Sequence, residues 1–160
     1  MVEIVDAGKN QVSRRAVINA PVEELFDIVS NPHRHHEIDG SGTVGTIVSG
    51  TERMIEGEPF TMKMRQFGMD YKTNSTPTQV RENEIVEWQV AGRQKWRWEF
   101  KPLDQNRTEV TETWDVDGLW LAPLFRITGM FGRNGKGIEK TLKGLQERYA
   151  SGPNTSSFGM

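Results

Sequence analysis

Apolar residues along this chain recur first at helical spacing, then at every second position, and finally at helical spacing again. A strand over residues 11–20 leads into a first helix, whose apolar stripe follows the i, i+3, i+4, i+7 rule: Val22, Leu25, Phe26 and Val29. Pro21 suits the first helical position because its missing N–H would have no partner there. Asn31 can cap a second, short helix that begins at Pro32 and ends at residues 40–42.

Between residues 43 and 117 the pattern has period two and is interrupted by turn-forming residues. The short connections predict hairpins, and therefore a meander of antiparallel strands with one apolar face and one solvated face. The expected strands are residues 43–49, 60–65, 71–81, 85–90, 96–101 and 108–116.

A second helical stripe predicts a long closing helix and comprises Ile138, Leu142, Leu145 and Tyr149. Several glycines lie just before it, at positions 129, 132, 135 and 137. Each interior glycine weakens a helix by about 0.5–1 kcal/mol relative to alanine. We therefore expect a break or kink between Gly132 and Gly137, which could gate an internal cavity.

Composition bounds the class of protein. The chain has 160 residues, which suits one domain at residues 11–150 with loosely ordered tails at 1–10 and 151–160. A formal net charge of -2 gives no general basic field, and no apolar run is long enough for membrane insertion. The N-terminal residues do not resemble a signal peptide, so a cytoplasmic location is expected. Because there is no cysteine, thiolate catalysis and Cys-based metal sites are excluded.

Basic and aromatic residues alternate over residues 93–101, a composition that also occurs on single-stranded nucleic acid platforms. The alternation places the aromatic rings on one face of the strand and the cations on the other. No base could then stack beside a cation, so nucleic acid is not an expected partner.

Five tryptophans, seven phenylalanines and seven methionines supply a large, adaptable apolar surface. Some of them fall on the apolar phase of their strands and can form either a solid core or the lining of a cavity: Phe60, Met62, Met64, Trp88, Trp96, Trp98, Phe100 and Trp114. The candidate cavity residues are Phe26, Phe60, Met62, Met64, Trp88, Trp96, Trp98, Phe100, Trp114, Phe125, Met130 and Ile138.

Glu112 is the one carboxylate on an apolar phase, which it shares with Val110, Trp114 and Val116. If it points inward, burial raises its pKa and makes it a candidate acid/base or ligand anchor. A bulge or strand end that turns Glu112 outward is the alternative.

All three histidines lie in the second short helix, at His33, His35 and His36. Their spacing forms no recognised metal motif, so neither a metal nor another cofactor is expected. An exposed short helix explains them more simply, whereas a place at a pocket mouth would make His35 and His36 catalytic or ligand-binding candidates.

Two segments carry a resemblance to a known family: INAPVEELFD at residues 18–27 and TETWDV at residues 111–116. With the order of elements above, the chain resembles the START/Bet v 1-like (SRPBCC) superfamily, and within it the bacterial polyketide cyclase/dehydrase-like ligand-binding proteins. The resemblance implies an α+β helix-grip fold, in which a curved antiparallel sheet of six to seven strands wraps around the C-terminal helix. It also implies a deep apolar cavity between sheet and helix.

The aromatase/cyclase members of that superfamily tend to have a Trp-Pro pair where this chain has His35-His36. This difference favours binding over catalysis. The first hypothesis is therefore a binding or carrier protein, monomeric or weakly dimeric, for an aromatic, polyketide-like or lipid-like molecule. A cyclase or dehydratase that uses Glu112 or a histidine as acid/base is the second hypothesis. A protein-interaction module that uses the outer sheet face is the third.

Overall fold

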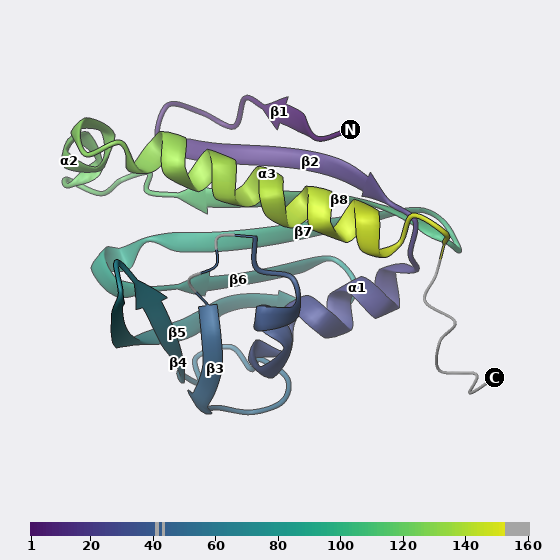
Figure 1. The fold of residues 1–160 in the computed structure, drawn as a ribbon, viewed down its shortest axis with the longest axis horizontal. Helices are drawn as coiled ribbons and strands as arrows, with labels where there is room; N and C mark the ends of the chain where they lie inside the picture. Colours follow the sequence, from purple (N-terminus) through teal and green to yellow (C-terminus); the bar gives the residue numbers. More distant parts are fainter. Residues whose placement is uncertain (41, 43, 153–160) are drawn as a thin grey trace.

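The computed structural model describes residues 1–40, 42 and 44–152 of the chain. They form one antiparallel sheet with eight strands in the order β1-β2-β8-β7-β6-β5-β4-β3, with a long helix, α3, across one face (Figure 1). The strands are β1 (Glu3–Val5), β2 (Gln11–Ile18), β3 (Val44–Ser49), β4 (Phe60–Gln66), β5 (Met69–Arg81), β6 (Ile85–Gln89), β7 (Lys95–Asp104) and β8 (Arg107–Asp115). The helices are α1 (Val22–Val29), α2 (Ala122–Ile127) and α3 (Met130–Arg148), with short 3₁₀ helices η1 (Pro32–Glu37) and η2 (Ala91–Arg93).

This arrangement is the α+β helix-grip fold predicted from the sequence. The sheet has one strand more than the expected six to seven, because β1 pairs with β2 at the edge and Arg15 forms a 3.0 Å ion pair with Glu3. Three residues are too few to show a period, so this edge strand had no detectable pattern. The predicted strand start at Thr43, the helix end at Ser41 and the tail over residues 153–160 lie outside the described residues.

The first two helices follow their predicted signals with one difference. Pro21 is the N-cap of α1, with extended backbone angles, and the helix begins at Val22 rather than at the proline. Asn31 caps η1 as expected, since its side chain accepts a hydrogen bond from the His33 backbone N–H at 3.0 Å. The cap fixes the direction of η1, which carries the three histidines, relative to α1.

The predicted break between Gly132 and Gly137 is wrong, because α3 is continuous from Met130 to Arg148. The chain instead breaks at Gly129, which adopts a left-handed conformation (φ 77°) between α2 and α3. Gly135 lies where α3 approaches the sheet most closely, and an added Cβ there would be 2.8 Å from the Arg14 guanidinium and 3.3 Å from Val12. This glycine therefore permits close packing, which a count of helix propensities does not consider.

Gly132→Ala is expected to raise the free energy of unfolding by about 0.5–1 kcal/mol, because an alanine restricts the unfolded chain and fits a helix better. Its Cβ would meet no atom within 4 Å. Urea denaturation followed by circular dichroism measures the change. Gly129→Ala is the matched control and should destabilise, since its positive φ suits glycine alone. Stabilisation by both substitutions would contradict the break at Gly129.

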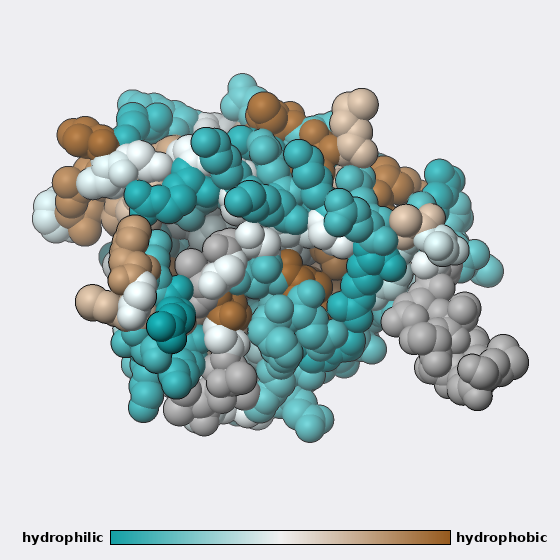
Figure 2. All heavy atoms as spheres, in the orientation of Figure 1, coloured by the Kyte–Doolittle hydropathy of each residue, from teal (hydrophilic) through white to brown (hydrophobic). Residues whose placement is uncertain are grey.

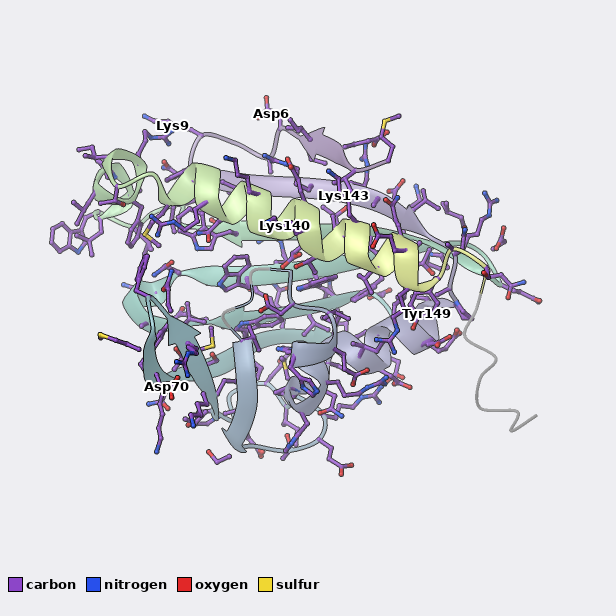
Figure 3. The ribbon with its side chains drawn as sticks, in the orientation of Figure 1. Asp6, Lys9, Asp70, Lys140, Lys143 and Tyr149 are labelled. Carbon is purple, nitrogen blue, oxygen red and sulfur yellow. The ribbon has the colours of Figure 1, made fainter. Side chains whose placement is uncertain are left out.

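Both ends of the α2–α3 segment are held by specific contacts. Near its start, the Trp114 ring packs edge-on against Phe125 and Phe131, with ring centroids 5.9 Å and 5.1 Å away. At the far end of α3, the Tyr149 hydroxyl donates to a Glu24 carboxylate oxygen of α1 at 3.1 Å. Lys140 and Lys143 project from the outer side of the helix (Figure 3). The helix is therefore fixed to the sheet by its inner side and both ends.

The outer sheet face, the surface that the interaction-module hypothesis would use, carries a polar network. Arg97 donates to Glu87 at 3.1 Å and to Asp115 at 3.2 Å. Burial alone would raise the pKa of Glu87, but hydrogen bonds from Gln79, Thr78 and Arg97 outweigh it and lower the pKa. Several strongly exposed apolar side chains lie near α2 and around the β4–β5 turn, namely Trp120, Ile127, Phe67 and Met69.

Candidate functional site

The inner face of the sheet is covered unevenly. Helix α3 packs mainly on β2, with further contacts to β8, whereas α1 packs on β7 and η1 contacts β3. Between these two covers, Trp88 of β6 and Trp96 of β7 are paired in register and are only partly buried. Apolar side chains are visible in this region between α3 and β3 (Figure 2). Two large rings therefore remain accessible in the middle of the sheet.

The structure divides the candidate cavity residues into two groups. One group is buried in the apolar core and comprises Phe26, Phe60, Met62, Trp98, Phe100, Trp114 and Ile138. The other group is only partly buried and comprises Met64, Trp88, Trp96, Phe125 and Met130. Period-two alternation identifies the inner face but cannot separate these groups, because the separation depends on where the helices cover that face.

Trp114 is held by its polar end as well as by packing. Its indole Nε1 donates to the Gln94 side-chain oxygen at 3.0 Å, and no part of the residue is exposed. Phe131, which completes the ring cluster around it, was not among the candidate residues. It lies just before the break predicted at Gly132 to Gly137, and extending the helical stripe of Ile138 back by seven positions would have revealed it.

Glu112 points inward, as alternation predicts, and is only 7% exposed. One carboxyl oxygen, Oε2, is enclosed and has no hydrogen-bond partner. Burial, reinforced by the charge of Asp39, raises the pKa of Glu112 well above its usual value. The raised pKa favours the protonated form of Glu112, which has a proton to donate.

The nearest cation by strand register does not neutralise Glu112. Arg14 of β2 is directly opposite Glu112 of β8. Its guanidinium instead donates to Glu139 of α3 and to the Ser13 carbonyl, both at 2.9 Å. Arg14 thus forms its ion pair with Glu139 of α3. Glu112 has no counter-ion among the described residues.

His35 is buried in the wall of this region. Its Nε2 lies 2.7 Å from the Val29 carbonyl, and its ring lies against Trp88 with centroids 5.0 Å apart. Burial lowers the pKa of His35 to about 4, against the opposing effects of the Val29 carbonyl and Asp39. A neutral imidazole must therefore donate its Nε2 proton to Val29, which makes this side chain a packing residue with one fixed hydrogen bond.

The other two histidines lie nearer the surface of η1. His33 approaches the Gly50 carbonyl at 3.2 Å, and His36 is exposed. Within residues 1–40, 42 and 44–152, no three His, Asp or Glu side chains are arranged to hold a metal ion. Of the three histidines in η1, only His35 therefore lies at the inner face of the sheet.

At Gly40, the loop after η1 lies directly against the backbone of α3. The Gly40 N–H donates to the Thr141 hydroxyl at 2.9 Å, and a Cβ on Gly40 would lie 2.4 Å from the Thr141 nitrogen. On the other side of the same loop, Asp39 accepts a hydrogen bond from the Val44 N–H at 3.0 Å. Only glycine fits this contact, which holds the end of η1 against α3.

Two surface hollows are lined by described residues, and neither contains a candidate cavity residue. One has a volume of about 510 Å³ and lies between the start of α1 and residues 102–105. The other, of about 360 Å³, lies between residues 4–8, the start of β2 and Phe131. Neither matches the deep internal cavity expected from the sequence, so that cavity stays a prediction.

Comparisons with known proteins agree with this architecture. The family described as polyketide cyclase / dehydrase and lipid transport matches residues 9–150. An uncharacterized protein of Mycobacterium tuberculosis, Rv0088, is 41% identical over 155 residues, which cover 94% of this chain and 69% of that protein.

Solved structures show the same fold at low identity. The crystal structure of protein Ms6760 from Mycobacterium smegmatis has a TM-score of 0.68 at 15% identity, covering 93% of this chain and 99% of the other. The solution structure of a protein from Arthrobacter aurescens has a TM-score of 0.69 at 18% identity, covering 92% and 91%. No helix in the described ranges is long and apolar enough to cross a membrane.

Proposed function

Because the chain belongs to the polyketide cyclase/dehydrase and lipid transport family, we propose that it binds an apolar small molecule on the inner face of its sheet, beside α3. The ligand is aromatic, polyketide-like or lipid-like. The protein acts as a carrier or binding protein in the cytoplasm, as a monomer or weak dimer.

The observation that supports this proposal most directly is the pair Trp88 and Trp96. They are partners in register on the apolar face of the two central strands, and both stay partly exposed while Trp98 and Trp114 are buried. Ligand sites in proteins are mostly apolar concave surfaces with a few polar groups. A flat ring placed against Trp96 would bury apolar area that folding leaves exposed.

Binding of 2-ethylnaphthalene, a neutral aromatic probe, tests the proposal. Saturable quenching of tryptophan fluorescence is expected with wild-type protein, and Trp96→Ala should weaken binding at least about fivefold through lost ring contact. Trp120→Ala is the matched control, since Trp120 is exposed on the α2 segment. Absence of saturable binding, or equal weakening by both substitutions, would refute the proposed site.

An acid/base enzyme is the second candidate, and Glu112 is the observation that favours it. A buried carboxyl group with a raised pKa can act as a general acid on a bound substrate. Conversion of a polyketone substrate that disappears in Glu112→Gln, with substrate affinity unchanged, would support an enzyme. Unchanged conversion in that variant would exclude Glu112 as the proton donor.

A further inference from the structure

We propose that Glu112 is the polar anchor of the binding site and donates a hydrogen bond to an uncharged acceptor, such as a ketone or ester oxygen, on an otherwise apolar ligand. This inference rests on the proposed function and specifies its ligand class. It starts from a side chain that is almost fully buried, points to the inner face and makes no hydrogen bond or ion pair among the described residues.

Strand register brings this carboxyl group next to the accessible tryptophans. Glu112 is directly opposite Trp98, and Trp114, two positions further along β8, is opposite Trp96. Glu112 and Trp96 are therefore diagonal neighbours on one face, a relation in which Cβ atoms lie roughly 7–8 Å apart and long side chains can reach one another. A ligand ring against Trp96 would have its edge within reach of the carboxyl group.

The charges around Glu112 favour an uncharged ligand oxygen. Asp39, on the loop after η1, is the acidic group that acts on it, so an anionic ligand would meet repulsion. Arg14 of β2 is paired with Glu139 of α3. The buried imidazole of His35, in η1, donates to the Val29 carbonyl. In its protonated form, which the raised pKa favours, Glu112 therefore meets no competing donor or acceptor in these partners. Its acid proton is the free donor that a ligand oxygen can use.

A buried polar group without a partner raises the free energy of the folded protein. A ligand that pairs with this group removes that cost and binds more tightly for it. A buried donor or acceptor without a partner loses its hydration and gains nothing in exchange. A ligand oxygen that accepts the Glu112 proton removes that cost, whereas a hydrocarbon ligand of the same shape leaves it. The site should thus discriminate between ligands of equal size by a single oxygen atom.

Three naphthalene derivatives of nearly equal shape test this inference: 2-acetylnaphthalene, 2-ethylnaphthalene and 1-(2-naphthyl)ethylamine. Wild-type protein should bind the ketone about tenfold more tightly than the hydrocarbon. Glu112→Gln should keep most of that preference, because its amide N–H also donates. Glu112→Leu should abolish the preference while still binding the hydrocarbon.

The pH dependence supplies a second measurement that a structural role would not affect. Ketone affinity in the wild-type protein should fall as pH rises and Glu112 loses its proton, whereas in Glu112→Gln it should stay constant. Equal wild-type affinity for ketone and hydrocarbon, persistence of the preference in Glu112→Leu, or tighter binding of the amine would each overturn the anchor but leave the apolar site standing. If none of the three compounds binds, the proposed function fails and the anchor fails with it.

Discussion

Trp98→Ala is expected to lower the free energy of unfolding by about 3–5 kcal/mol, the range for removing a fully packed tryptophan from a core. Trp98 is 3% exposed, lies between Val86 and Glu112 in the sheet, and stacks on Phe100 with ring centroids 6.4 Å apart. Removing the indole leaves a space that the neighbouring strands cannot close, because they are tied by backbone hydrogen bonds on both sides. Urea denaturation measures the change.

The matched control for that substitution is Trp120→Ala. Trp120 is 86% exposed, so its removal should change the free energy of unfolding by no more than about 0.5 kcal/mol. A cost below about 1 kcal/mol for Trp98→Ala would show that the interior next to Glu112 is open rather than packed. In that case Trp98 would be a ligand-contact residue, and the accessible region would extend further along β7 than Trp96.

Acidification from pH 6.5 to pH 4 is expected to remove about 3 kcal/mol of stability through His35 alone. The pKa of His35 falls from 6.5 to about 4 on folding. A base with a lowered folded-state pKa stabilises the protein fully above its unfolded pKa and loses that contribution as pH falls through the window between the two values. Protonation would also place a charge against Trp88 in an apolar wall.

His35→Gln and His36→Gln separate this effect from the other titrating groups. Both residues belong to η1, but His35 is 7% exposed whereas His36 is exposed. The difference in unfolding free energy between wild type and His35→Gln should shrink with acidification by about 3 kcal/mol. The difference for His36→Gln should change much less, because the charge of His36 is only the smallest cause of the lowered pKa of His35. Equal slopes for the two variants would mean that His35 does not carry the acid sensitivity.

Much of the fold follows from local patterns that can be recognised in the sequence. The Asn31-Pro32 cap, the apolar stripe of α1 and the alternation in β7 each depend on residues close together in the chain, so they could be recognised without a structure. The continuity of the last helix, α3, could not be recognised in this way. It depends on Gly135 meeting Arg14, a contact between residues far apart in the chain, which makes a glycine favourable where propensity counts it as a defect.

The same distinction holds for the candidate site. Alternation was enough to turn Glu112 inward, because its strand neighbours share its phase. It could not show that Arg14 faces the same way, or that Glu139 would take the arginine away and leave the carboxyl group alone. Nor could it show that η1 buries His35 and exposes His36, because that depends on how a single turn packs against Trp88.

The pairing of β2 with β8 has a consequence for how the chain folds. Ser13 and Thr113, joined across these strands by a 2.8 Å hydrogen bond, are 100 positions apart, whereas β4 to β8 are joined by short hairpins. Closing so long a loop is costly in entropy, and sheets that depend on distant pairs fold in milliseconds to seconds. During synthesis, β2 cannot pair with β8 until β8 has left the ribosome.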